Sequence, residues 1–238
     1  MIGTENSFDY KNLRASFSWN CPADFNFAFD VLPQKAKDPA KKALICINRA
    51  GEHVEDITYD RLEKESSRCA NALLKLGVAK TDTVLLVLPR WPEWYYLLFG
   101  CAKMGAVAMP GTNLLTANDM EYRINRAGAK VAVVSETHLD AIEQIKSKCP
   151  TLEHLIIVRN SRDGWHNFEK ICQAAACSID RSMVPSTRSD DLMLIYFTSG
   201  TTAMPKMVGR DHAYAYSHHI TKDYWQDLRA SDIHWTLT

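Results

Sequence analysis

Short apolar runs alternate with helical patterns along most of this sequence, and this alternation constrains the fold more than any other feature. The apolar runs, which include many β-branched residues, stand at 83–88, 106–109, 131–134, 155–158 and 192–197. Continuous apolar runs are typical of strands that are buried on both faces of a parallel sheet. Segments with apolar residues at helical spacing surround them, between 58 and 77 and at 92–104, 116–127, 137–148 and 165–175. The pattern predicts an α/β fold in which helices flank a mostly parallel, doubly wound sheet.

Signals at the helix ends support these positions. Thr116 is a good N-cap residue with Asp119 three residues later, and Gly128 follows the expected last residue. Pro92 suits the first turn of the helix over 92–104, and Gly105 stands just past its end. We also expect a short helix at 24–32, a strand at 44–48, a second strand ending near 57 and a connecting loop at 178–190. Neither a repeat nor a low-complexity linker divides the sequence, so we assign 1–238 to part of one domain.

Charge and cysteine content exclude several classes of function. Lys and Arg number 28, and so do Asp and Glu. This balance, without long basic runs, makes nucleic acid a poor candidate partner. The seven cysteines form no C-x-x-C pair and never join the eight histidines at ligand spacing, which argues against a metal site in the protein. Their odd number and scattered positions indicate a reducing compartment and no disulfide framework.

We expect a soluble, cytoplasmic protein. The N-terminus carries Glu5 and Asp9 and no apolar core, so it does not have the pattern of a secretory signal. The longest apolar run covers 94–102, whereas a helix needs about 20 apolar residues to cross a bilayer.

The stretch that follows the last buried run has the composition of a phosphate-binding loop. Ligands of parallel sheets bind beyond the carboxyl ends of the strands. Gly200 can adopt a positive φ, which lets successive backbone N–H groups turn inward and form a nest for an anion. The hydroxyls of the loop add hydrogen-bond donors, and Lys206 adds a compact positive charge. The stretch comprises Thr198, Ser199, Gly200, Thr201, Thr202, Ala203, Met204, Pro205 and Lys206.

Composition alone would also fit an ordinary polar surface loop, and known phosphate motifs do not match it. Pro205 stands where a Walker A loop has its second glycine, and the sequence has neither the G-x-G-x-x-G pattern of dinucleotide sites nor a G-x-S-x-G elbow.

The order of the residues, however, resembles the signature of the adenylate-forming superfamily. Residues 196–206 read Y-F-T-S-G-T-T-A-M-P-K, which is similar to the superfamily pattern (Y or F)-T-S-G-T-(T or S)-G-x-P-K. Three further segments look like medium-chain acyl-CoA synthetases: L-P-R-W-P-E-W at 88–94, G-A-V at 105–107 with P-G-T at 110–112, and D-I-H-W at 232–235. Ala203 departs from the pattern, which has glycine there. If that position needs a positive φ, alanine costs about 1 kcal/mol.

This resemblance implies that a carboxylic acid is activated at the expense of ATP. The acid, a medium-chain or branched fatty acid in the branch that this sequence resembles, becomes an acyl-adenylate and then a coenzyme A thioester, with ATP, Mg²⁺ and coenzyme A as cofactors or co-substrates. The loop 198–206 would bind the β- and γ-phosphates. Its hydroxyls at Thr198, Ser199, Thr201 and Thr202 would be donors, and Thr198 and Lys206 are the candidate catalytic residues.

Other candidate residues have weaker support. Arg90 follows a buried strand and could meet a phosphate, although an ion pair with Glu93 is the favoured alternative. Gly111 and Thr112 could border a thiol channel, but a plain turn is favoured. His212, His218 and His219 lie on an expected helix, and we interpret them as structural. Trp235 either flanks the acyl pocket or belongs to the core.

Synthetases of this kind are more than twice as long as this sequence. The resemblance therefore predicts that this sequence is an incomplete portion of the large N-terminal domain and that this portion alone is inactive. A strand-like pattern at 233–237 lies directly before the last residue. Three interpretations stay open: an acyl-CoA ligase seen in part, another adenylating enzyme of the superfamily, or a catalytically inactive relic or binding protein. The sequence does not fix the acid or the oligomeric state, and a homo-oligomer stays open.

Overall fold

A seven-stranded sheet forms the centre of the molecule. The computed structural model describes residues 9–48, 50–198, 204–229 and 231–235. The strand order is β7-β6-β5-β3-β4-β8-β9, and neighbouring strands are parallel except for the antiparallel pair β8–β9. The predicted α/β fold with a mostly parallel sheet is therefore confirmed. The strands are β3 (Thr83–Val87), β4 (Val107–Pro110), β5 (Ala129–Val134), β6 (His154–Ile157), β7 (His166–Asn167), β8 (Leu192–Thr198) and β9 (Lys206–Asp211).

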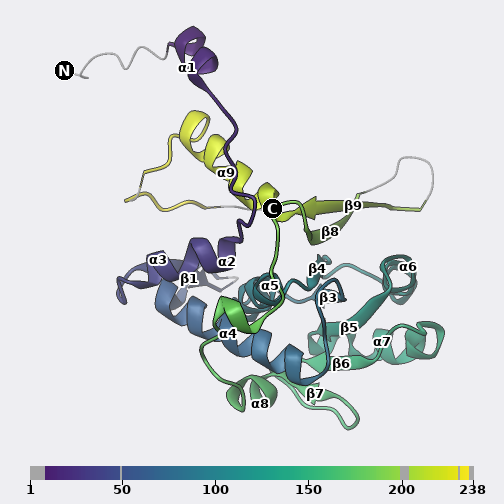
Figure 1. The fold of residues 1–238 in the computed structure, drawn as a ribbon. Coiled ribbons are helices and arrows are strands. Elements are labelled where there is room, and N and C mark those ends of the chain that lie inside the picture. Colours follow the sequence, from purple (N-terminus) through teal and green to yellow (C-terminus); the bar gives the residue numbers. More distant parts are fainter. Residues whose placement is uncertain (1–8, 49, 199–203, 230, 236–238) are drawn as a thin grey trace.

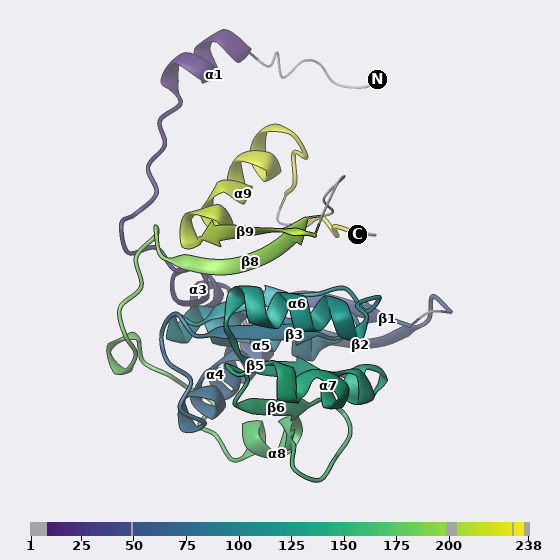
Figure 2. The same ribbon diagram turned by 90° about the vertical axis from the view of Figure 1, so that its right-hand side faces the viewer.

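Helices cover both faces of this sheet (Figures 1 and 2). One face is packed against α4 (Tyr59–Lys75), α5 (Pro92–Met104) and α8 (Phe168–Gln173), and the other against α6 (Ala117–Ala127) and α7 (Leu139–Ile145). The last helix, α9 (His212–Tyr224), follows β9 directly. Smaller elements complete the fold: α1 (Tyr10–Ser16), α2 (Phe27–Asp30), α3 (Leu32–Ala36), the antiparallel pair β1 (Lys42–Ile47) and β2 (His53–Thr58), and the 3₁₀ turns Glu136–His138, Lys146–Lys148 and Arg181–Met183.

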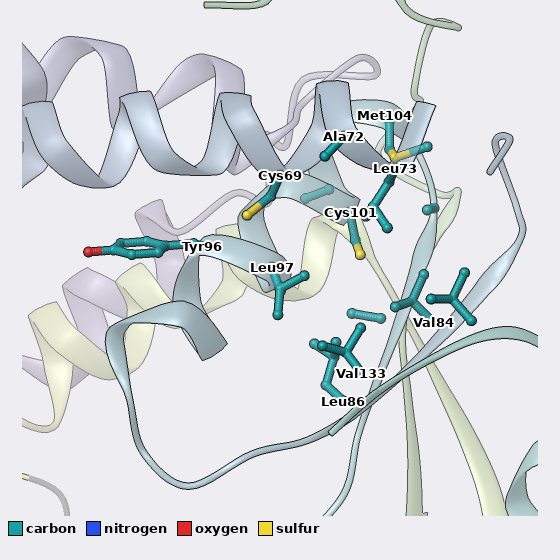
Figure 3. Close-up of a cluster of buried hydrophobic side chains, with 14 of the residues drawn as sticks. Cys69, Ala72, Leu73, Val84, Leu86, Tyr96, Leu97, Cys101, Met104 and Val133 are labelled. Carbon is teal, nitrogen blue, oxygen red and sulfur yellow. The ribbon is translucent and has the colours of Figure 1, made fainter. Parts of the chain in front are cut away.

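Strand β3 shows why the apolar runs of the sequence are continuous. Successive side chains of a strand point to opposite faces of a sheet. Val84 and Leu86 accordingly join the core beneath α4 and α5, whereas Leu85 and Val87 join the core beneath α6 and α7. Figure 3 shows the first of these cores, where Leu97 of α5 lies near Leu86. A strand with helices on both sides needs apolar residues at every position.

The helix-end signals of the sequence are confirmed. The Thr116 side chain accepts a hydrogen bond from the backbone N–H of Asp119, and the Asp119 carboxylate accepts one from the backbone N–H of Thr116, which forms a capping box. Helix α5 has Pro92 at its first position and ends at Gly105, whose φ of 73° lies in the left-handed region. Glycine adopts this region without the steric cost that a side chain adds.

Several elements differ from the sequence predictions. The helix expected at 24–32 is two short helices, α2 and α3, and the helix expected at 137–148 is α7 between two 3₁₀ turns. The segment 165–175 begins with the short strand β7 and continues as α8. Residues 232–235 have no regular secondary structure, so the strand expected at 233–237 is wrong for its described part, and 236–237 lie outside the described residues. Helix α1 and strand β9 were not predicted.

A lysine is fully buried between α4 and α5. Lys103 of α5 is 0% exposed, and its Nζ lies 2.5 Å from Oε1 of Glu63 on α4. The same ammonium group stands 5.1 Å from the centre of the Phe29 ring. Burial lowers the pKa of Lys103, and the carboxylate of Glu63 opposes that shift. The buried charge therefore depends on one carboxylate and one aromatic face.

Within the described ranges, none of the helices combines the length and the apolar character that crossing a membrane requires.

Candidate phosphate-binding site

The candidate loop connects the two antiparallel strands at one edge of the sheet. Strand β8 is parallel to its neighbour β4, and its carboxyl end is Thr198, which is exposed. Strand β9 begins at Lys206, which is also exposed. Thr198 lies directly opposite Lys206 in the β8–β9 pair, and Phe197 lies opposite Met207. The predicted Ser199, Gly200, Thr201, Thr202 and Ala203 lie outside the described residues. Their contacts with phosphates stay a prediction, and whether the backbone at Ala203 needs a positive φ stays open.

Both described ends of this loop contact helix α6. The hydroxyl of Tyr122 donates a hydrogen bond of 3.0 Å to the backbone carbonyl of Pro205. The Tyr122 ring also meets the ring of Phe197 edge-on, with 5.9 Å between ring centres. The guanidinium carbon of Arg123 stands 5.2 Å from the centre of the same Phe197 ring. Helix α6 thus touches the chain on both sides of the segment 199–203.

The charge on Arg123 is itself held by α6. Its guanidinium donates to the backbone carbonyl of Asp119 at 3.0 Å and lies 3.6 Å from the Asp119 carboxylate. Hydrogen bonds from Thr116, aided by Arg123, lower the pKa of Asp119. An ionised Asp119 therefore orients the guanidinium that covers Phe197. Sequence reasoning identified the capping role of Asp119 but missed Tyr122 and Arg123, because nothing local marks them apart from other half-buried residues of an amphipathic helix.

A surface cavity of about 530 Å³ adjoins the end of the loop. It is lined by Met204 and by residues of α6: Asn118, Glu121, Tyr122, Asn125 and Arg126. Within the described part of the chain, no three His, Cys, Asp or Glu side chains gather as metal ligands would. The described residues near the loop thus offer aromatic, amide and cationic groups, one carboxylate (Glu121) and no metal-binding cluster.

Arg90 does not form the ion pair that was favoured for it. Glu93 instead bonds to Arg159, with 2.8 Å from its Oε1 to the Arg159 Nε, and this guanidinium also covers the Trp91 ring at 4.5 Å. Arg159 reaches Glu93 from the far end of β6, a partner that local spacing could not indicate. Arg90 is exposed, and its contact with a phosphate stays a prediction.

Thr112 begins a tight turn that closes with the hydrogen bond from the Leu115 N–H to its carbonyl, and Gly111 directly precedes this turn. The Thr112 hydroxyl accepts a hydrogen bond from the backbone N–H of Leu114. A Cβ atom added to Gly111 would lie 2.6 Å from Cδ1 of Leu115, so a larger residue would require the Leu115 side chain to shift. The favoured turn is therefore found at Thr112, whereas a border with a thiol channel stays a prediction.

The three histidines of α9 have separate surroundings. His212 is fully buried, and burial lowers its pKa from 6.5 to about 4. His218 meets the Tyr214 ring edge-on at 4.7 Å and lines an apolar cavity of about 290 Å³ beneath α9. His219 packs against Tyr216, with 4.6 Å between ring centres. These contacts agree with a structural role.

Trp235 is 62% exposed and therefore does not belong to the core of the described structure. Its part in acid binding stays a prediction.

A model of the family described as AMP-binding enzyme matches residues 32–238 of this chain. The chain belongs to the AMP-binding enzyme family. Among curated members, it is 37% identical to the mitochondrial acyl-coenzyme A synthetase ACSM4 of Mus musculus, over 91% of this chain and 38% of that protein. It is 33% identical to the mitochondrial acyl-coenzyme A synthetase ACSM3 of Homo sapiens, over 98% of this chain and 41% of that protein. The chain thus spans about two fifths of the length of these relatives.

Solved structures of ligases share the fold. The anthranilate CoA ligase AuaEII in complex with anthranoyl-AMP matches 86% of this chain and 38% of its own, with a TM-score of 0.73 and 25% identity. A fatty acyl CoA synthetase of Mycobacterium tuberculosis matches 80% of this chain and 35% of its own, with a TM-score of 0.66 and 28% identity. The family and the sheet topology therefore agree with the resemblance that the loop sequence carries.

Proposed function

We propose that this chain carries the phosphate-binding part of an ATP-dependent acid–thiol ligase. The observation that carries the proposal is the AMP-binding family match across 32–238, which includes the Thr-Ser-Gly-rich segment at the carboxyl end of β8. In the reaction, a carboxylate oxygen attacks the α-phosphorus of ATP, and the bond to the bridging oxygen breaks as pyrophosphate leaves. The sulfur of coenzyme A then attacks the acyl carbonyl, AMP leaves, and the thiol proton passes to solvent.

The loop residues have defined parts in this proposal. Thr198 and Lys206 stand opposite each other where β8 and β9 meet the loop, so a hydroxyl donor and a positive charge face the pyrophosphate from the same end of the sheet. Such groups act by positioning and by stabilising charge on the moving phosphates, without a protein nucleophile. Mg²⁺ enters as the complex with ATP, held by the phosphate oxygens. The described residues gather no metal cluster of their own.

The substrates are proposed from the relatives. Acyl-coenzyme A synthetases and an anthranilate CoA ligase share this family or fold, which supports a carboxylic acid as substrate and coenzyme A as acceptor. A medium-chain or branched fatty acid is the proposed acid, and the reaction needs small molecules only. The curated relatives named above are mitochondrial. The proposed compartment is therefore either the predicted cytoplasm or the mitochondrion.

Acid-dependent exchange of labelled pyrophosphate into ATP tests the proposal. The assay uses the complete expressed polypeptide that contains residues 1–238, with straight, branched and aromatic acids of increasing length. Exchange that depends on a fatty acid, followed by thioester formation with coenzyme A, supports the proposal. Exchange in which coenzyme A does not accept the acyl group identifies another adenylating enzyme. Absence of both exchange and ATP binding identifies a catalytically inactive protein and overturns the proposal.

A further inference from the structure

Helix α6 holds both ends of the proposed phosphate loop, although it is distant from that loop in sequence. The Tyr122 hydroxyl and the Pro205 carbonyl that it binds are separated by 83 residues. Pro205 has no backbone N–H, so its carbonyl is its one backbone hydrogen-bonding group, and Tyr122 occupies it immediately before Lys206. On the other side of the loop, the Phe197 ring lies against Tyr122 edge-on and beneath the Arg123 guanidinium.

These contacts have the character of a support rather than of a ligand site. The Arg123 side chain is only 12% exposed, and Asp119 neutralises it, so its charge is directed at the Phe197 face and not at solvent. The Tyr122 hydroxyl is used by a backbone carbonyl. Both residues therefore contact the residues that flank the loop, Tyr122 through its ring and hydroxyl and Arg123 through its guanidinium.

We propose that Tyr122 and Arg123 are positioning residues for the phosphate loop of this ligase. This inference rests on the proposed function. The two side chains fix Phe197 and Pro205 against α6. Thr198 and Lys206 are thereby kept as paired residues of β8 and β9 before ATP binds. Preorganised donors stabilise developing charge without having to reorganise during the reaction, and a displacement of about 1 Å at such a group can cost about a hundredfold in rate.

Two variants separate the hydrogen bond from the aromatic contacts. Tyr122→Phe removes the hydroxyl and keeps the ring on Phe197. Tyr95→Phe is its matched control, because the Tyr95 ring also meets an aromatic ring edge-on, that of Trp94, at 5.0 Å. Arg123→Gln removes the guanidinium from Phe197. Arg159→Gln is its matched control, because Arg159 likewise covers an aromatic ring and pairs with a carboxylate.

The first measurement is hydrogen–deuterium exchange of the peptide from Thr198 to Met207 in the complete expressed polypeptide without ligand. We expect Tyr122→Phe to speed exchange there by about fivefold, as the loss of one net hydrogen bond predicts, with little change in peptides from α4 and α5. The second measurement is the affinity for MgATP together with kcat and KM of pyrophosphate exchange. We expect kcat to fall by about fivefold, with the KM for the acid unchanged and both controls at the wild-type level.

The outcomes distinguish this inference from the proposed function. Unchanged exchange of the loop peptide in both Tyr122→Phe and Arg123→Gln overturns the positioning role, whatever the enzyme's activity. Faster exchange with wild-type kcat and MgATP affinity shows a purely structural anchor and also overturns it, while the ligase proposal stands. Failure of the wild-type protein to bind MgATP or Mg-pyrophosphate overturns the proposed function. It also overturns the proposal that Tyr122 and Arg123 position a phosphate-binding loop.

Discussion

Thr198 and Lys206 are cross-strand partners in the antiparallel β8–β9 pair, although a whole loop separates them along the chain. Side chains of directly opposed residues emerge on the same face of a sheet, with about 5 Å between their Cβ atoms. The candidate hydroxyl and the candidate ammonium are therefore neighbours without any contribution from the loop itself. The first and last residues of the sequence motif thus form one end of the proposed site.

This pairing makes Lys206 the most informative residue for mutation. Lys206→Ala removes the positive charge beside the proposed pyrophosphate, and we expect the adenylation rate to fall by about 10²–10³, as for the loss of one preorganised donor. Pyrophosphate exchange in the complete expressed polypeptide measures the effect. Lys222→Ala is the matched control, because Lys222 is an exposed lysine of α9 that pairs with its neighbour Asp223. A loss of less than about threefold would remove Lys206 from the mechanism.

The buried ion pair between Lys103 and Glu63 gives a prediction about stability. Lys103→Met leaves the Glu63 carboxylate without its cation, and its second oxygen, Oε2, is already buried with no hydrogen-bond partner in the described part of the chain. Breaking a buried pair on one side typically destabilises a protein by about 3–5 kcal/mol. We expect a loss of that size in urea unfolding.

The double variant Lys103→Met with Glu63→Leu provides the control. It removes both charges and should recover most of the stability, because an apolar pair of similar volume can replace a buried ion pair. Equal stability of Lys103→Met and wild type would contradict this account.

The local signals of the sequence predicted most of the fold. Thr116, Asp119 and Gly128 mark the ends of α6 correctly because capping depends on residues within one turn of the helix. The continuous apolar run of β3 identifies a central strand because both faces of the sheet are covered. The edge strand β9 is mostly exposed, with only Val208 and Asp211 half-buried, so it lacks that run and was not predicted.

The candidate site was predictable only in part. The order of residues 198–206 pointed to a phosphate loop without any structure. By contrast, the Tyr122 contact with Pro205 and the Arg159 pair with Glu93 join residues from different elements, and only the assembled sheet brings them together. Sequence spacing predicted that Glu93 pairs with Arg90, but in the folded protein its carboxylate pairs with Arg159.

The cysteines are predicted to differ sharply in reactivity. Burial raises the pKa of Cys101 to about 12, and burial together with the neighbouring Cys172 thiol raises the pKa of Cys69. Because the thiolate is the reactive form, we expect maleimide to label these two at least about a hundredfold more slowly than exposed Cys177 at neutral pH. Peptide mass spectrometry after timed labelling measures the order, with urea-unfolded protein as the reference. Labelling of Cys101 as fast as Cys177 would contradict the buried packing seen in Figure 3.

His212 should make the protein sensitive to acid. It is fully buried, and neither ring nitrogen has a hydrogen-bond partner among the described residues. Its pKa falls from 6.5 to about 4, chiefly because burial disfavours the charged ring. Asp191 and Asp211 oppose this shift, whereas Lys80 and Arg181 favour it. Between these two pKa values the unfolded chain binds a proton that the folded chain does not, so the free energy of unfolding decreases as pH falls from 6.5 to about 4.

The variant His212→Phe isolates this contribution. Phenylalanine has a similar ring, and the replacement breaks no hydrogen bond with any residue that the structure describes, because the His212 side chain makes none there. Each pKa unit corresponds to about 1.4 kcal/mol, so the wild-type protein should lose roughly 3 kcal/mol more than the variant across the interval. Urea unfolding at a series of pH values measures both curves. Parallel curves would mean that the pKa of His212 is the same in the folded and the unfolded protein, and would contradict this account.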